Sequence, residues 1–384
     1  MTRHRGRLKT IACSIMFALF ASLMVTPLAL ADTSTSWTAV STIPGNSAMA
    51  GQVWRSMAYS ADGSHLAAVE GGDIWTSTDG GTSWVENSTL SGSLGTGGQY
   101  WISIASSADG SHLAAVVANG GDIWTSNNGG ISWTDDSLLS GNSGTAGQSW
   151  VSITSSADGS HLAAVVVGGD IWTSTNGGTS WTAVSTIPGN SAIASQQWYA
   201  ITSSADGSHL TAGVFNGHIW TSTNGGTSWT DDSLLSGNSG TAGRIWTSIA
   251  SSADGSHLAA VASGGDIWTS TNGGTSWVNN STLSGNSGTA GRNWFSIASS
   301  ADGSHLAAGD AGGDIWITGY EPGSVATSSA SSSAASNVSL PPSSPDTGYG
   351  TPSSSELLGE VSGCIALLCI ISGVILRFHS SWSS

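Results

Sequence analysis

Apolar and small polar residues alternate in short runs along most of this chain, and the same pattern returns about every 48 residues. Residues 246–252 alternate as a half-buried strand does, and Asp254-Gly255 supplies a tight turn. Residues 257–261 and 266–270 follow as the second and third strands, and a fourth is expected around 275–277. Each repeat therefore predicts four short antiparallel strands.

Six copies of this repeat follow one another, each opened by a tryptophan 47 to 49 residues after the last. These are Trp54, Trp101, Trp150, Trp198, Trp246 and Trp294. This period is typical of a four-stranded blade of a β-propeller. The sequence thus predicts an all-β fold, a six-bladed β-propeller of four-stranded antiparallel blades.

The two ends of the array predict how the propeller closes. The sixth copy stops after residue 316 without a fourth strand, whereas residues 35–40 form an orphan strand before the first copy. Residues 35–48 repeat residues 179–192 without a difference. We therefore expect the N-terminal strand to complete the last blade, which would remove the exposed sheet edges.

The segments outside the propeller, which spans residues 32–320, predict an exported and tethered protein. Residues 1–31 combine basic residues with an apolar run and a small-residue end, as a signal peptide does. Residues 321–356 are rich in Ser, Ala, Thr and Pro and predict a disordered stalk. Residues 357–376 predict a transmembrane helix, and 377–384 a short cytoplasmic tail. The propeller is then expected outside the cell.

Composition excludes some classes of partner. The chain after residue 31 carries all 24 acidic residues and only four arginines, so nucleic acid is not an expected partner. Residues 32–320 contain no cysteine, so no disulfide can stabilise the propeller. Its stability must come from a packed core.

The turn before the fourth strand carries a recognisable motif. Residues 77–84, S-T-D-G-G-T-S-W, resemble the Asp-box, or bacterial neuraminidase (BNR) repeat, with its S-x-D-x-G-x-x-W pattern. The acceptor residue of the five turns is Asp79, Asn128, Asn176, Asn224 and Asn272. Either side chain can accept backbone N–H bonds in such a turn. The resemblance implies a propeller of the sialidase-like superfamily, which also includes noncatalytic receptors and photosystem-assembly propellers.

The C-terminal tail carries a second motif. Residues 344–348, S-P-D-T-G, resemble the L-P-x-T-G signal of sortase substrates through Pro345, Asp346, Thr347 and Gly348, with Ser344 in place of leucine. The resemblance implies transfer to the cell wall by a sortase. The alternative is a membrane anchor made by the helix alone.

A ring of polar residues is expected on the face formed by the connections between blades. It stands two residues before each leading tryptophan and consists of Gln52, Gln99, Gln148, Gln196, Arg244 and Arg292. Closure would bring Arg55 of the first blade beside Arg244 and Arg292. Glu70 and Asp310 are acids that break the repeat on the same face.

This sector resembles a sialidase site, in which three arginines hold a carboxylate beside a tyrosine nucleophile and an acidic partner. Arg55, Arg244, Arg292, Glu70 and Asp310 are the candidate catalytic residues that the resemblance implies. Tyr59, Tyr100 and Tyr199 are candidate nucleophiles, and nothing in the sequence selects among them.

Other repeated polar residues have structural explanations. One histidine follows the first turn of each copy, which spaces these residues too widely for a shared metal ion. They are interpreted as solvated residues at the start of a strand. The repeated aspartates that open the third strand are Asp73, Asp122, Asp170, Asp266 and Asp314. They are interpreted as turn caps, with a structural calcium ion as the alternative and no cofactor expected.

Three functions remain open at this point. The first is a noncatalytic surface propeller that binds a glycan, a wall polymer or a protein. The second is a glycoside hydrolase of the sialidase type, and the third is an assembly scaffold similar to the photosystem-assembly propellers. Near-identity of the blades favours the first, because catalysis requires different groups from different blades.

Overall fold

The computed structural model describes residues 39–93, 95–283 and 285–318. They belong to the first of two compact parts of the chain, 1–322 and 323–384. The predicted signal peptide, stalk, sortase-like motif, transmembrane helix and cytoplasmic tail lie outside the described residues. Within the described ranges, no helix is long and apolar enough to cross a membrane.

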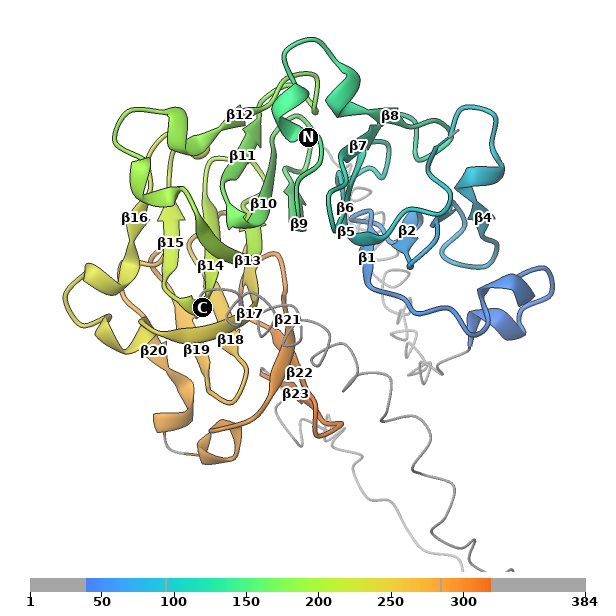
Figure 1. Ribbon diagram of the computed structural model, residues 1–384. Helices are drawn as coiled ribbons and strands as arrows, with labels where there is room; N and C mark the ends of the chain where they lie inside the picture. The colour runs from blue at the N-terminus through green and yellow to red at the C-terminus, as the bar shows by residue number, and fades with distance from the viewer. Residues whose placement is uncertain (1–38, 94, 284, 319–384) are drawn as a thin grey trace, which may run out of the picture. The chain divides into compact units, whose positions relative to one another are not determined.

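The strands fall into successive antiparallel groups, named here repeats 1 to 6 in chain order (Figure 1). The first strands are β1 (Ser56–Tyr59), β5 (Trp101–Ser106), β9 (Trp150–Ser155), β13 (Gln196–Ser203), β17 (Arg244–Ser251) and β21 (Trp294–Ser299). The second strands are β2 (Leu66–Val69), β6 (Leu113–Val117), β10 (Leu162–Gly169), β14 (Leu210–Gly217), β18 (Leu258–Ala262) and β22 (Leu306–Asp310). The third strands are β3 (Ile74–Ser77), β7 (Ile123–Ser126), β11 (Ile171–Ser174), β15 (Ile219–Ser222), β19 (Ile267–Ser270) and β23 (Ile315–Ile317).

The fourth strands are only two residues long and lie just beyond the predicted position. They are β4 (Val85–Glu86), β8 (Thr134–Asp135), β12 (Thr182–Ala183), β16 (Thr230–Asp231) and β20 (Val278–Asn279). In repeat 5 the strand begins after Trp277 because Thr275 and Ser276 are held by Asn272 in the preceding turn. Repeat 6 contributes the three strands β21, β22 and β23.

Short 3₁₀ helices connect the repeats. They are η1 (Val40–Thr42), η2 (Ser47–Met49), η3 (Asn87–Thr89), η4 (Asp136–Leu138), η5 (Ser143–Thr145), η6 (Val184–Thr186), η7 (Ser191–Ile193), η8 (Asp232–Leu234), η9 (Ser239–Thr241), η10 (Asn280–Thr282) and η11 (Ser287–Thr289). Val40 was expected in a strand but begins η1, as Val184 begins η6 after β12. The first part of the predicted N-terminal strand lies outside the described residues.

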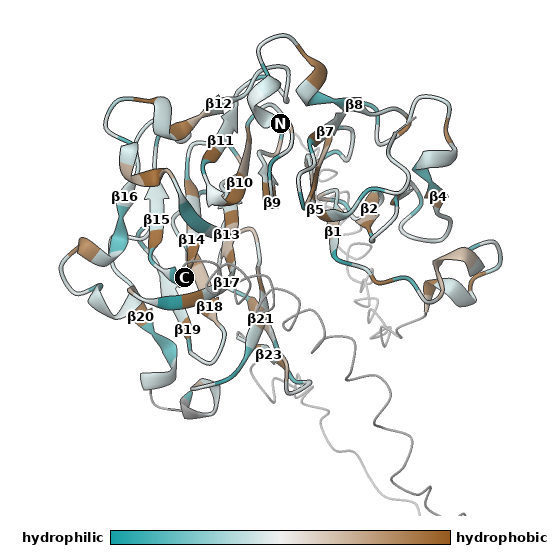
Figure 2. Cartoon of the chain, in the orientation of Figure 1, coloured by the Kyte–Doolittle hydropathy of each residue, from teal (hydrophilic) through white to brown (hydrophobic). Residues whose placement is uncertain are grey.

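The core lies between the sheets of neighbouring repeats. The first strand of each repeat packs against that of the next, from β1 on β5 to β17 on β21. Five buried apolar clusters occupy the five junctions, and each joins a third-strand isoleucine to a first-strand isoleucine of the following repeat. Apolar residues accordingly lie along strands such as β10 and β14 (Figure 2). Antiparallel sheets that pack in chain order through their first strands form a β-propeller fold.

A chain of backbone hydrogen bonds also links the turns between first and second strands. The turn alanine of each of repeats 1 to 5 donates its N–H to the alanine carbonyl of the next repeat at 2.7 Å, which links Ala61, Ala108, Ala157, Ala205, Ala253 and Ala301 in order. The turn glycine lies against the histidine of the preceding repeat. At Gly207, where φ is +74°, a side chain would overlap His161. The repeated histidines, expected to be solvated, are therefore half-buried junction residues from repeat 1 to repeat 5.

Four connections also contact the following repeat through an asparagine, at Asn46, Asn142, Asn190 and Asn238, whereas the connection into repeat 2 has Ser93 at this position. Asn142 accepts a hydrogen bond from the Trp181 backbone N–H at 3.0 Å and donates to Thr179 O at 3.2 Å. Asn46, which precedes repeat 1, contacts Trp84 N and Thr82 O in the same way, at 3.3 and 3.0 Å. The described N-terminal segment thus occupies the place that the end of a preceding repeat would occupy.

Two junctions contain buried carboxyl groups. Asp136 accepts hydrogen bonds from Thr125 Oγ1 at 2.7 Å and from Trp181 Nε1 of the next repeat at 2.9 Å. Asp232 has equivalent partners in Thr221 and Trp277. Burial raises the pKa of both carboxyl groups to about 7, although the hydrogen bonds oppose the shift.

This burial predicts an unusual pH dependence. The folded protein keeps both carboxyl protons up to about pH 7. In the unfolded chain the same two groups release their protons near the ordinary aspartate pKa of 3.8. The free energy of unfolding should therefore fall as the pH rises from 4 to 7, by about 2–4 kcal/mol for each carboxyl group. Urea unfolding of the Asp136→Asn/Asp232→Asn variant should show a much flatter profile in this range.

Asp158→Asn is the matched control for this experiment. Hydrogen bonds from Ser156 and Ser160 lower the pKa of the exposed Asp158, so its titration affects stability only below about pH 4. This variant should keep the fall between pH 4 and 7. An unchanged slope in the double variant would contradict the assignment to Asp136 and Asp232.

Candidate functional site

The six predicted ring positions share one local contact. The side chain of each donates a hydrogen bond to the backbone carbonyl four residues earlier, where the connection turns into the first strand. The glutamine Nε2 distances are 3.2, 3.1, 2.9 and 3.0 Å for Gln52, Gln99, Gln148 and Gln196. Arg244 and Arg292 make the same bond through Nε at 2.6 Å. Glutamine and arginine are therefore structurally equivalent here.

Each arginine of the ring has further partners inside its own repeat. Arg244 Nη1 lies 3.4 Å from Asp266 Oδ2, and its guanidinium group lies over the ring of Trp268 at 4.8 Å. Arg292 Nη1 lies 2.6 Å from Asp310 Oδ2, and its guanidinium group lies over Trp316 at 4.4 Å. Repeats 5 and 6 thus contain two similar arrangements of arginine, carboxylate and tryptophan.

Asp310 is a buried carboxylate in a position that is apolar in repeats 2 to 5 and is Glu70 in repeat 1. Val117, Val166 and Val214 are its buried counterparts in repeats 2 to 4. Burial raises the pKa of Asp310, but hydrogen bonds from Arg292 and from the backbone of Asp314 and Gly312 outweigh it and leave the pKa below its usual value. This predicted catalytic candidate is therefore an ionised partner of Arg292.

Arg55 faces a different neighbour. Its guanidinium group lies 4.2 Å from the ring centre of Tyr100, which belongs to the connection into repeat 2. Its Nε is buried and has no hydrogen-bond partner among the described residues. The three arginines of the predicted sector thus lie on three separate aromatic rings, each with its own surroundings.

The remaining predicted candidates also have local surroundings. The Glu70 carboxyl group lies near that of Glu86, whose pKa is raised by burial first and then by Asp73 and Glu70. Tyr59 is exposed, whereas Tyr199 packs against Phe215 with ring centres 5.9 Å apart. Burial raises the pKa of Tyr199, which disfavours the ionised form that a nucleophile requires.

Two of the repeated third-strand aspartates accept hydrogen bonds from backbone N–H groups of their own repeat. Asp73 Oδ1 accepts from Ile74 N at 2.8 Å and from Ser88 N at 3.2 Å. Asp170 accepts from the equivalent groups of Ile171 and Ser185. Within the part of the chain that is described, no group of three or more His, Cys, Asp or Glu side chains could hold a metal ion.

A histidine–carboxylate pair in repeat 4 was not anticipated. His218 stands where the other repeats have the third-strand aspartate, and its Nδ1 lies 2.6 Å from Asp231 Oδ2. Asp231 also accepts bonds from the backbone N–H and the hydroxyl of Ser233. The break in the aspartate pattern at residue 218 was the signal in the sequence, but the partner is distant along the chain and could not be read from it.

The five turns predicted as Asp-boxes bond mainly within themselves. Asn176 Oδ1 accepts from Ser180 N, and its Nδ2 donates to Ser180 Oγ, both at 2.9 Å. At Asp79 the polarity of the second bond is reversed, because Ser83 Oγ donates to Oδ2 at 2.6 Å. The acceptor residues of these turns are therefore held by the turns they shape.

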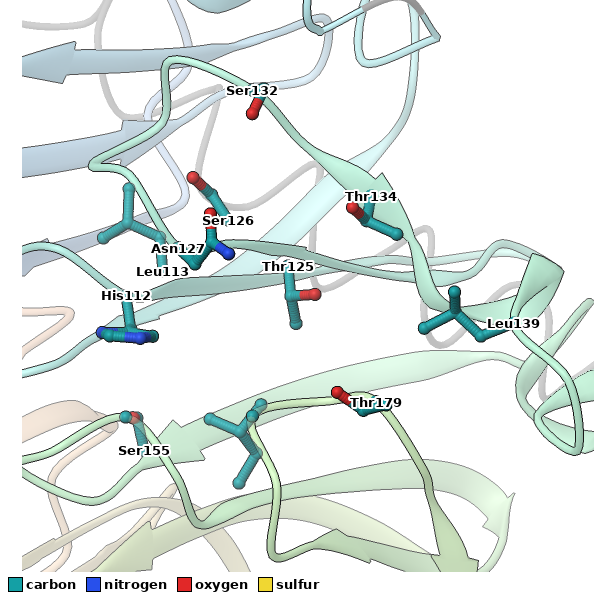
Figure 3. A pocket seen from close by; sticks show the side chains of 13 residues that line it. His112, Leu113, Thr125, Ser126, Asn127, Ser132, Thr134, Leu139, Ser155 and Thr179 are labelled. Carbon is teal, nitrogen blue, oxygen red and sulfur yellow. The ribbon is translucent and has the colours of Figure 1, made fainter.

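Two grooves lie between neighbouring repeats. The first, of about 270 Å³ between repeats 2 and 3, has His112, Thr125 and Thr134 on one wall and Ser155 and Thr179 on the other (Figure 3). The second, of about 250 Å³, occupies the equivalent position between repeats 5 and 6. Neither is lined by an arginine or a carboxylate, so the predicted catalytic candidates lie outside both.

No protein-family model matches the sequence, and no curated protein matches it. Among solved structures, the chain is similar to a GH74 enzyme of Niastella koreensis, with 19% identity, a TM-score of 0.48 and 70% of this chain covered. It is similar to a GH74 xyloglucanase from Xanthomonas campestris, with 18% identity, a TM-score of 0.49 and 68% covered. It spans only 37% and 44% of these two enzymes. YCF48 from Cyanidioschyzon merolae is 16% identical, with a TM-score of 0.37 and coverage of 69% of this chain and 94% of that protein.

The two arginine–aspartate pairs are expected to contribute differently to the free energy of unfolding, and replacing each arginine by glutamine measures the difference. Arg292→Gln should keep the bond to Gly288 O that the ring glutamines make, but it leaves the carboxylate of Asp310 buried without a counter-ion. We expect the free energy of unfolding to fall by about 2–4 kcal/mol in urea titrations.

Arg244→Gln is the control, because Asp266 keeps bonds from Asn279 and Ser281 and its contact with Arg244 is longer. Its cost should stay below about 1 kcal/mol. Equal losses in the two variants would contradict the difference between the pairs.

Proposed function

We propose that this protein is a noncatalytic propeller of the cell surface that binds a polymer rich in hydroxyl and carboxylate groups, a glycan or a wall polymer. The observation that carries the proposal is the shared contact of the ring residues. A bond to the carbonyl four residues earlier fixes each side chain in the same way. The glutamine Oε1 atoms have no partner among the described residues, so they stay available to hydroxyl donors. The guanidinium N–H groups of Arg244 and Arg292 that the aspartates leave unbonded can donate to oxygen atoms of the ligand.

The surroundings of the candidate catalytic groups favour binding over hydrolysis. Sialidase chemistry would need three guanidinium groups around one substrate carboxylate, but each arginine here has separate partners. Arg292 is neutralised by the buried Asp310, and Tyr199 is desolvated. A repeated set of equal contacts suits a repeating ligand better than a single reacting bond.

We further propose that the propeller has six blades and is closed by its N-terminal strand. Supporting this, Asn46 contacts repeat 1 as Asn142 contacts repeat 3, so residues 39–50 behave as the end of a preceding blade. The turn bonding of Asp79 and its four asparagine counterparts is consistent with Asp-boxes, and we assign the propeller to the sialidase-like superfamily on that motif.

The proposed location follows from the sequence outside the described residues. Residues 1–31 would direct export, 321–356 would act as a stalk, and 357–376 would anchor the chain in the membrane. Residues 345–348 would allow a sortase to transfer it to the cell wall. The ligand face would then be presented at a distance from the membrane.

A glycan array and an activity screen together test this proposal. The full-length chain in detergent should bind a subset of acidic or hydroxyl-rich glycans and should not release fluorophore from sialosides or aryl glycosides. Gln148→Ala/Gln196→Ala should weaken binding about 5- to 20-fold, since each loses one or two hydrogen bonds to the ligand.

Asn127→Ala, an exposed change in the groove between repeats 2 and 3, is the matched control and should bind as the parent does. Turnover that disappears in Arg244→Ala would overturn the noncatalytic assignment. Equal binding by Gln148→Ala/Gln196→Ala and by the parent would show that the ring does not contact the ligand. If no glycan on the array is bound, a protein ligand would be favoured instead.

A further inference from the structure

Two sheet faces at opposite ends of the array expose large apolar side chains. On the face of repeat 1 these are Val53, Met57 and Tyr59, and on the face of repeat 6 they are Phe295, Ile315 and Ile317. Their exposed fractions lie between 40% and 80%. Exposed apolar patches of this kind mark surfaces that another surface covers.

The interior junctions identify what covers Met57 and Ile315. Met57 occupies the position of Ile104, and Ile315 occupies the position of Ile74. Ile74 and Ile104 are buried together in the cluster between repeats 1 and 2, and the same pair of positions recurs in all five clusters. Met57 and Ile315 are therefore the two unmatched halves of a sixth pair.

Tyr59 and Ile317 match through the grooves. At the junction of repeats 2 and 3 the equivalent residues are Ser155 and Thr125, which line opposite walls of the groove (Figure 3). Only the two ends of the array replace these small polar residues with large side chains, tyrosine in repeat 1 and isoleucine in repeat 6. The two replacements would fill one groove from both sides.

Val53 and Phe295 match through a third contact. They correspond to Tyr100 and Arg55, whose side chains meet at 4.2 Å between repeats 1 and 2. The first strand is bulged after its leading tryptophan, so the residue that follows the tryptophan faces the next repeat while later residues face the previous one. Phe295 thus faces the side on which repeat 1 would follow repeat 6.

We propose that Val53–Phe295, Met57–Ile315 and Tyr59–Ile317 form an apolar clasp that docks the sheet of repeat 6 on the sheet of repeat 1 of the same chain. The inference deepens the closed propeller of the proposed function and rests on it. It adds a junction made of sheet faces to the closure by the N-terminal strand.

Two further contacts, one hydrogen bond and one packing contact, are formed at the five interior junctions. Among the described residues, no backbone bond joins Ala301 N to Ala61 O, which would be the sixth link of the alanine chain. Gly63 has nothing near its Cβ position, whereas Gly110 meets His65 and Gly303 meets His257. Docking would place the exposed His305 against Gly63.

The partner of each face is the other end of the same chain rather than a second copy. Both faces belong to one compact part of the chain, so their docking is intramolecular and does not depend on protein concentration. A second copy would have to compete with this intramolecular docking. Its capture is an outcome that the test distinguishes.

Cysteine pairs in the full-length chain test the clasp. Met57→Cys/Ile315→Cys, and separately Tyr59→Cys/Ile317→Cys, are treated with a short bismaleimide at low protein concentration and mapped by mass spectrometry. Peptide mapping separates the new link from any that involves the natural cysteines 13, 364 and 369. We expect a link within one chain, with a yield that does not change on tenfold dilution.

Ile123→Cys/Ile153→Cys, which share a buried cluster, is the positive control, and Met57→Cys/Leu234→Cys is the negative control. A positive control that reacts while both clasp pairs stay unlinked would overturn the proposal, as would links found only between chains. Glycan binding is measured on the same samples. A linked chain that binds nothing would reject the proposed function and keep the clasp, whereas an unlinked chain that binds would do the reverse.

Discussion

Every repeat of this protein depends on its neighbour, because a four-stranded sheet exposes apolar residues on both faces and cannot bury them alone. Three contacts recur at each interior junction: an isoleucine pair in the cluster, a backbone bond between turn alanines, and a histidine packed on a turn glycine. Glycine is required in this turn both because φ is positive and because the histidine side chain lies close to its Cα. Stability is therefore a property of the junctions rather than of single sheets.

The period of the sequence predicted most of the fold because the same physical requirements recur in each copy. Alternation located β17, β18 and β19 to within a residue or two, and the Asp-Gly turns follow from the need for positive φ. The fourth strand was placed too early, since the bonds to Asn272 retain the preceding residues in the turn. Val40 was misassigned because the chain begins a 3₁₀ helix at this residue, as it does at the equivalent Val184.

The candidate site was less accessible to sequence reasoning. Arg55, Arg244 and Arg292 could be grouped by blade, but the bulge after the leading tryptophan of repeats 2 to 6 decides which neighbour a side chain faces, and alternation does not reveal it. In repeat 1, Arg55 contacts Tyr100. The burial of Asp136 and the pairing of His218 with Asp231 depend on contacts between residues 13 to 45 positions apart. Such contacts are set by the packing of sheets, which no local pattern encodes.

Charge distinguishes repeats that otherwise look alike. In repeats 4, 5 and 6 a cationic or ionisable side chain meets a carboxylate near the start of the third strand, through His218, Arg244 and Arg292. In repeat 1 the equivalent region holds two carboxyl groups, Asp73 and Glu86. Burial is the main cause that raises the pKa of Glu86, and repulsion from Asp73 adds to the shift. A ligand that spans several repeats would therefore meet the same hydrogen-bonding groups in each repeat but a different local charge. The two directions around the ring would then differ for the ligand.

Closure of the propeller requires every sheet, including the first and the last, to be buried against a neighbour. Hydrogen–deuterium exchange of the full-length chain measures this burial strand by strand. Amides of β1 and of β22 and β23 are expected to exchange as slowly as those of β13 and β14, which lie in the interior of the array. Exchange in the end strands that is faster by orders of magnitude, while the interior stays protected, would contradict closure.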